Sequence, residues 1–237
     1  MSEHRIADSI PNLPPLVSPG MLREPILQDD SRGRFDQHNL LLMMEGIRPD
    51  ALFIGDSLTA GWPVESLFAD IFPVVVNRAL GGDAVKYIHR RLEADVFQLK
   101  PKNLFFMVGT NDIAFRFGYD TDDTIVAEMT ANYRICFDMI RQAGIRTYLG
   151  TIPPVRQLLK QDIMFARKMV LLPRLNVVLR DMATEYGFTL LDYFAEMVDA
   201  QGEFIAELTS DGCHFTAQGY YVANRLVRRE LSLHLPA

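Results

Sequence analysis

The chain has 237 residues, of which 49% are apolar and 23% are charged, and its net charge is −6. This size and composition predict one large soluble domain with a sizeable core. The acidic balance argues against a general nucleic-acid partner, because such binding needs a basic surface. No apolar run reaches the roughly 18 residues of an integral membrane segment.

The N-terminus predicts neither a signal peptide nor a compact unit. It reads MSEHRIADSIPNLPP, without a basic-then-apolar signal pattern. Residues 1–35 carry five prolines and little periodicity, so we expect a proline-rich arm followed by a single domain over 36–237. The two cysteines, Cys136 and Cys213, do not suggest a disulfide framework, and a cytoplasmic setting is the default expectation.

The domain begins with a short predicted helix over 37–45, capped by Asp36 and ended by Gly46. Beyond it, strand and helix patterns alternate. Short apolar runs predict strands at 51–54, 74–77, 103–108, 146–150 and 189–192. Apolar residues at steps of three and four predict helices at 85–99, 122–143, 174–186 and 218–233. The start of the third of these is open, because Pro173 stands where a longer helix would be interrupted.

This alternation predicts parallel βαβ units with right-handed crossovers. We expect an α/β fold, a three-layer α/β/α sandwich around a five-stranded parallel sheet, flavodoxin-like in its winding. Ligands bind beyond the C-terminal strand ends of such sheets. The loops to search are therefore 55–62, 78–84, 109–119, 151–168 and 193–216.

Ser57 stands in the first of these loops. The stretch ALFIGDSLTAGW runs from an apolar strand into a glycine turn, which would lift the Ser57 hydroxyl above the sheet edge. A serine there is a candidate nucleophile if a base and oxyanion donors come from other loops. Taken alone, Gly-Asp-Ser is more often a polar turn.

The other loops hold residues that suit these roles. Asp211 stands three residues before His214, so it can accept the Nδ1 proton and leave Nε2 as a base. Gly81 and Gly82 can present backbone N–H groups, and Asn111 can offer an amide donor. Each is weak alone, since glycine pairs are common in loops, an Asn can cap a helix, and most histidines have structural roles.

Together the blocks FIGDSLTAGW, VVNRALGGDAV, LFFMVGTNDI and LTSDGCHFTAQGYYVANRL occur in an order that is similar to the SGNH hydrolases, also called GDSL esterases and lipases. The pattern most resembles the branch that includes platelet-activating-factor acetylhydrolase catalytic subunits. The resemblance implies that Ser57 is the nucleophile, His214 the general acid–base and Asp211 its orienting group. It also implies an oxyanion hole made by the N–H groups of Ser57 and Gly82 and the amide of Asn111.

The implied activity is a serine esterase that hydrolyses small or short-chain acyl esters through an acyl-enzyme, without a metal or other cofactor. Trp62, Phe115 and Phe165 are candidates for substrate contact, although packing in the core explains each equally well. Asp56, Asp83 and Asp112 are expected to fix loops by accepting hydrogen bonds. A homodimer is one option, made through an apolar surface or the arm.

Rival functions remain open at the level of sequence. Within enzymes they are a lysophospholipase, a thioesterase and a carbohydrate O-deacetylase. From other classes they are a non-catalytic sugar- or lipid-binding protein and a flavodoxin-like nucleotide binder. The last is disfavoured, because neither GxxxxGK[ST] nor GxGxxG follows any predicted strand.

Overall fold

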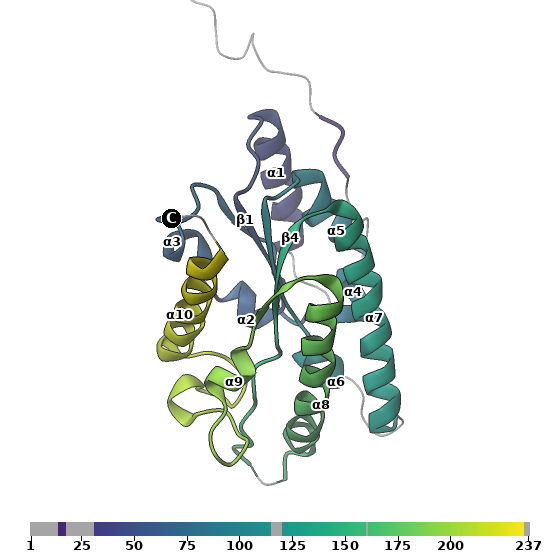
Figure 1. Ribbon diagram of the computed structural model, residues 1–237, viewed down its shortest axis with the longest axis vertical. Coiled ribbons are helices and arrows are strands. Elements are labelled where there is room, and N and C mark those ends of the chain that lie inside the picture. The colour runs from purple at the N-terminus through teal and green to yellow at the C-terminus, as the bar shows by residue number, and fades with distance from the viewer. Residues whose placement is uncertain (1–13, 18–30, 115–119, 160, 235–237) are drawn as a thin grey trace, which may run out of the picture.

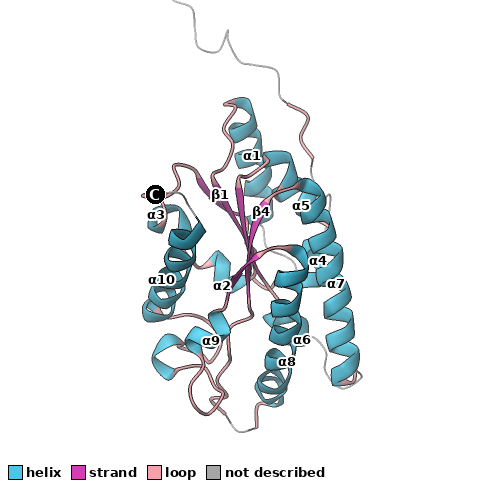
Figure 2. Ribbon diagram, viewed as in Figure 1, coloured by secondary structure: helices cyan, strands magenta, loops and turns pink. Residues whose placement is uncertain are grey.

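A single parallel sheet forms the centre of the molecule (Figures 1 and 2). The computed structural model describes residues 14–17, 31–114, 120–159 and 161–234. The strands are β1 (Ala51–Gly55), β2 (Val75–Asn77), β3 (Asn103–Met107), β4 (Arg146–Gly150) and β5 (Thr189–Leu191). Their order is β2-β1-β3-β4-β5, and every pair is parallel. This confirms the predicted five-stranded, doubly wound α/β fold.

The strands bury both faces, which explains their continuous apolar runs. In β1, Leu52 and Ile54 pack on one side of the sheet, and Ala51 and Phe53 pack on the other. The register pairs Gly55 of β1 with Met107 of β3. The two central strands thus end level, and the loops that follow them leave from the same edge.

Helices form the outer two layers (Figure 1). One apolar core lies under α4 (Val85–Ile88), α5 (Leu92–Asp95), α7 (Asp122–Ala143) and α8 (Ile163–Tyr186), with α1 (Ser31–Met44) and α6 (Thr110–Ala114) at its margins. The other lies under α2 (Ser57–Ala60), α3 (Val64–Leu67), α9 (Tyr193–Met197) and α10 (Ala217–His234). Two 3₁₀ turns, η2 (Phe97–Leu99) and η3 (Ala206–Leu208), complete the described elements.

Local sequence signals explain the ends of the longest helices. The Thr121 hydroxyl accepts the N–H of Thr124 and caps α7, and Gly144 ends that helix in the left-handed region at φ +65°. Asp162 caps α8 by accepting the N–H of Phe165. The helix predicted over 122–143 is confirmed without change.

The structure gives the helix start that Pro173 left open, and it corrects the bounds of the first predicted helix. The helix that ends at Tyr186 begins at Ile163 and contains Pro173. Proline removes one backbone hydrogen bond, but buried Leu172 and Leu175 on either side keep this segment packed against the core. The N-terminal helix α1 begins at Ser31, within the stretch predicted to be an arm.

The helix predicted over 85–99 was also wrong, because the chain forms α4, α5 and η2 instead. The apolar residues that predicted this helix face are nevertheless all buried: Val85, Ile88, Leu92, Val96 and Leu99. The break between α4 and α5 falls at Arg91, whose backbone leaves helical geometry at φ −119° and ψ 2°. Its side chain is fully buried, so this segment buries a charged group as well as an apolar face.

Candidate active site

Ser57 is the first residue of the short helix α2 at the end of β1. Asp56 caps that helix, and its Oδ1 accepts the N–H of Leu58 at 3.0 Å. A Cβ atom on Gly55 would lie 2.1 Å from the carbonyl oxygen of Met107, so only glycine allows β1 to turn this close to β3. The turn therefore places Ser57 at the carboxyl edge of the sheet, where it is half-buried.

His214 reaches this serine from the loop between η3 and α10. Its Nε2 lies 2.9 Å from the Oγ of Ser57, and its Nδ1 lies 2.6 Å from the Oδ2 of Asp211. The other carboxylate oxygen, Oδ1, accepts the backbone N–H groups of Cys213 and His214. The three predicted residues are thus brought together, across 157 positions of sequence in the case of Ser57 and His214.

The environment of Asp211 determines the tautomer of His214. Partial burial raises the pKa of Asp211, but the hydrogen bonds from the ring and backbone of His214 and from the Cys213 N–H outweigh it and lower the pKa to about 2. A carboxylate that is ionised at neutral pH can only accept, so Nδ1 carries the proton. Nε2 of the neutral ring then presents a lone pair to the Ser57 hydroxyl, which is the arrangement of a general base.

The loop that carries His214 is held from the outside by Arg156. A Cβ on Gly212, which has φ +86°, would lie 2.2 Å from the carbonyl oxygen of Arg156, so no other residue fits. The N–H of Arg156 donates to the Gly212 carbonyl at 2.8 Å, and its guanidinium pairs with Asp199 and Glu203. Arg156 therefore has a structural role in this loop.

Asn111 and Gly82 lie on the two neighbouring loops. Asn111, at the start of α6, donates one amide hydrogen to the carbonyl oxygen of Asp83 at 2.9 Å, which leaves its second N–H for another acceptor. Gly82 directly precedes Asp83 and adopts φ +75°, the left-handed region that favours glycine.

Three buried acids fix these loops, as expected. Besides Asp56, Asp83 accepts the N–H of Ala84 at 2.9 Å and Asp112 accepts that of Val85 at 3.0 Å. Burial raises the pKa of all three, to about 7 for both Asp56 and Asp112. Within the described part of the chain, no group of three His, Cys, Asp or Glu side chains could hold a metal ion.

The structure places the residues that were predicted to contact substrate in different environments. Trp62 is 2% exposed and packs against Phe53, Phe68 and Tyr193, which supports the packing alternative. Phe165 lies within the first turn of α8, not in a loop. Phe115 lies outside the described residues.

Two residues of this region were missed by sequence reasoning. The Asn77 amide donates to the carbonyls of Thr59 and Trp62, and its oxygen accepts the N–H of Ala79, so it ties the end of β2 to the Ser57 turn. Arg91 lies three positions after the apolar Ile88. Its helical spacing on the apolar face was the signal that could have identified it as a buried charge.

These features define an α/β hydrolytic enzyme with a serine at the carboxyl edge of its sheet, and the comparisons with known proteins agree. The family model of the GDSL-like lipases and acylhydrolases matches residues 53–222. The chain belongs to this family and so to the SGNH hydrolase superfamily, and it is an ester-hydrolysing enzyme.

The individual relatives below share between 20% and 27% of their residues with this chain. The chain is 27% identical over 204 residues to platelet-activating factor acetylhydrolase IB subunit alpha2 of Homo sapiens and of Bos taurus, with 82% of this chain and 81% of the relative covered. A GDSL-like lipase from Bacteroides thetaiotaomicron has a TM-score of 0.71 at 20% identity, covering 86% of this chain and 98% of that one. The acetylxylan esterase Axe2 from Geobacillus stearothermophilus has a TM-score of 0.61 at 23% identity, covering 76% and 93%. These two structures share the fold.

Among the helices of the described part, none is both long enough and apolar enough to cross a membrane.

Proposed function

We propose that the enzyme is a serine esterase in which Ser57 is the nucleophile, His214 the general acid–base and Asp211 the group that orients His214. The observation that carries this proposal is the unbroken chain of hydrogen bonds from Ser57 Oγ through the imidazole to the Asp211 carboxylate, with contacts of 2.9 and 2.6 Å. A nucleophile, a base and a group that orients the base are the arrangement that activates a serine for acyl transfer.

The reaction follows from the protonation states of the three groups. The Ser57 oxygen attacks the ester carbonyl while Nε2 of His214 takes its proton, and a tetrahedral oxyanion forms. The imidazolium, stabilised by ionised Asp211, returns that proton to the departing alcohol, which leaves an acyl-enzyme. Water then repeats the sequence: it gives a proton to His214, attacks the acyl carbon and releases the acid and Ser57.

The oxyanion is held, in this proposal, by the backbone N–H groups of Ser57 and Gly82 and the free amide hydrogen of Asn111. The Asn111–Asp83 contact supports this role, because it fixes the amide plane and connects the two loops. Donors that are already in position need no reorganisation during the reaction, and each is worth roughly 100- to 1,000-fold in turnover.

Small or short-chain acyl esters are the proposed substrates. Two similar proteins are named for acetyl groups, the platelet-activating factor acetylhydrolase subunit and the acetylxylan esterase. Those names support a short acyl group and suggest two different alcohols.

The test is hydrolysis of p-nitrophenyl esters from acetate to long chains by the wild type, Ser57→Ala and the control Ser66→Ala, which changes an exposed serine of α3. We expect the highest rates with the shortest acyl groups, no activity in Ser57→Ala and full activity in Ser66→Ala. A fluorophosphonate should label Ser57, as mass spectrometry of its peptide would show.

Other outcomes separate the alternatives. An optimum at long chains favours a lysophospholipase, and activity on acyl thioesters or acetylated sugars alone favours a thioesterase or a carbohydrate deacetylase. A folded wild type that hydrolyses none of these and leaves the fluorophosphonate unreacted would refute the proposal in favour of a binding protein.

A further inference from the structure

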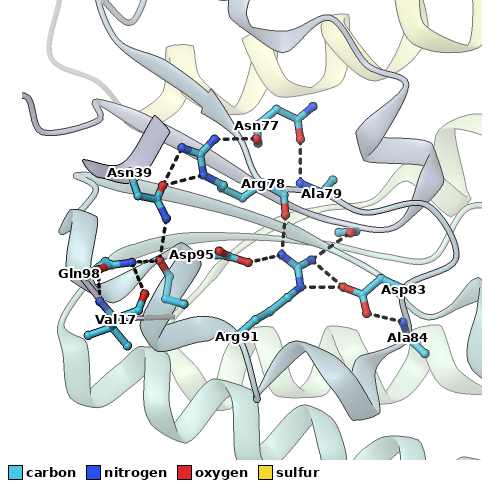
Figure 3. A network of polar contacts seen from close by, with 12 residues as sticks. Val17, Asn39, Asn77, Arg78, Ala79, Asp83, Ala84, Arg91, Asp95 and Gln98 are labelled. Atoms are coloured by element: carbon cyan, nitrogen blue, oxygen red, sulfur yellow. Dashed lines mark hydrogen bonds and ion pairs between the residues drawn. The ribbon is translucent and has the colours of Figure 1, made fainter. Parts of the chain in front are cut away.

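A buried guanidinium, that of Arg91, lies behind the proposed oxyanion hole. Arg91, in the break between α4 and α5, is 0% exposed (Figure 3). Its Nε and Nη2 both reach Asp83 Oδ2, at 2.8 and 2.6 Å. Its Nη1 donates to the carbonyl of Arg78 at 2.6 Å and to Asp95 Oδ2 at 2.9 Å, and Nη2 makes a longer contact of 3.4 Å with the carbonyl of Gly55.

Apart from Asp95 of α5, these acceptors belong to the two backbone segments that carry proposed oxyanion donors. The Gly55 carbonyl ends β1, two positions before Ser57. The Arg78 carbonyl begins the loop after β2, and Asp83 directly follows Gly82 in that loop. One rigid side chain therefore connects the two segments whose N–H groups would bind the same oxyanion.

Backbone hydrogen bonds fix the start of the Gly82 loop, because the N–H of Leu80 donates to the Gly55 carbonyl at 3.0 Å. The two glycines that follow have fewer contacts of their own. Glycines 81 and 82 have no side chains to pack, and Gly82 requires a left-handed backbone. Asp83, the next residue, is held at two points: its carboxylate accepts from the Arg91 guanidinium, and its backbone carbonyl accepts from the Asn111 amide. A lysine could not replace Arg91 in this role, because a single ammonium cannot reach acceptors spread over a planar fork.

From these contacts we propose that Arg91 is a positioning residue for the oxyanion hole, which sets the spacing between the N–H groups of Ser57 and Gly82. This rests on the proposed function, and Arg91 itself touches no substrate. Contacts to an oxyanion are made in the transition state, so their misplacement lowers kcat and leaves KM nearly unchanged. A displacement of about 1 Å costs on the order of 100-fold.

The experiment compares Arg91→Lys with the matched control Arg78→Lys. Arg78 is also buried, at 2% exposure. Its side chain donates to Asn39 of α1 at 3.0 and 2.8 Å and to the carbonyl of Asn77 at 3.0 Å (Figure 3). Both variants lose a buried guanidinium, and both should therefore melt at a lower temperature. A loss of kcat that occurs only in Arg91→Lys would therefore report the geometry of the oxyanion hole and not the loss of stability that both variants share.

With a p-nitrophenyl ester, Arg91→Lys should lower kcat by about 10- to 100-fold with KM within about threefold of wild type. Its affinity for a short alkyl boronic acid, which forms a tetrahedral adduct on the serine, should fall by a similar factor. Arg78→Lys should keep kcat and boronate affinity within about threefold.

A folded Arg91→Lys enzyme with wild-type kcat, or equal losses in both variants, would overturn the positioning role. Should Arg91→Lys not fold, Asp83→Asn tests the same contact, because asparagine keeps an oxygen for Ala84 but removes the charge that Arg91 grips. Wild-type kcat in that variant would overturn the inference as well. A wild type that neither hydrolyses esters nor reacts with fluorophosphonate would instead refute the proposed function, and the positioning role with it.

Discussion

Replacing Asp211 with asparagine tests the electrostatic logic of the site most directly. The asparagine oxygen can still accept the two backbone N–H groups that Oδ1 accepts now. Its amide nitrogen would face Nδ1 of His214, however, and a donor there favours the tautomer with the proton on Nε2. The imidazole would then have no lone pair for the Ser57 hydroxyl. We expect kcat to fall by roughly 1,000- to 10,000-fold, as for a triad with the wrong tautomer.

The effect on stability should be small in comparison. The pKa of Asp211 is lowered from 3.8 to about 2, so its carboxylate stabilises the fold above about pH 4, and this contribution is lost as the pH falls through 2. Its side chain is 53% exposed, and screening by solvent reduces the contribution to about 1 kcal/mol or less. For a domain of this size that is about 2–4 °C in Tm.

Asp199→Asn is a closely matched control. Asp199 also accepts two backbone N–H groups on Oδ1, from Gln201 and Glu203, but its Oδ2 faces Arg156 instead of a histidine. The assay is steady-state hydrolysis of p-nitrophenyl acetate at pH 7.5, with thermal melts of each variant. Turnover by Asp211→Asn within tenfold of wild type, or an equal loss in Asp199→Asn, would refute the reasoning.

Three further predictions concern residues around the triad. Asn111→Ala should lower kcat by about 100- to 1,000-fold and leave a folded protein, as circular dichroism would show. A kcat near that of the wild type in the folded variant would contradict the role of Asn111 as a donor. Gly55→Ala should destabilise the fold by about 3 kcal/mol or more, because its Cβ would meet the Met107 carbonyl at 2.1 Å; a wild-type urea midpoint would show that this turn can relax. Asp56→Asn should gain stability relative to wild type as the pH rises from about 4 to 7. Burial holds the pKa of Asp56 at about 7, so the folded protein keeps a proton that the unfolded chain releases near 3.8. The gain is at most about 4 kcal/mol at 1.36 kcal/mol per pKa unit, and equal differences in unfolding free energy at pH 4.5 and 7.5 would disprove it.

Much of the fold was predictable from local patterns. A short apolar run that ends at a turn residue is enough to mark a strand buried on both faces, and all five strands lie where such runs were found. The ends of α7 were predictable too, because Thr121 and Gly144 satisfy the helix termini with their own atoms. In these cases the determinants lie within a few residues of the structure that they produce.

The helix start that was left open and the helix that was predicted wrongly have a different cause. Pro173 is tolerated in α8 because packing by residues such as Leu175 outweighs one lost hydrogen bond, and packing depends on what lies opposite. The break at Arg91 reflects acceptors on β1 and the loop after β2, which are distant in sequence. Periodicity within 85–99 can place Arg91 on the buried face, but it contains no information about those distant acceptors.

The sequence by itself determined where the strands lie along the chain, the sheet edge at which the loops meet and the residue types that those loops carry. Only the tertiary structure decided that Ser57, His214 and Asp211 meet within hydrogen-bond distance, that Trp62 packs in the core, and that one buried arginine joins the Ser57 and Gly82 segments. The physical reason is range. Strand and cap preferences act between neighbours in the chain, whereas hydrogen-bond geometry at a site depends on crossovers that bring remote segments to within about 3 Å.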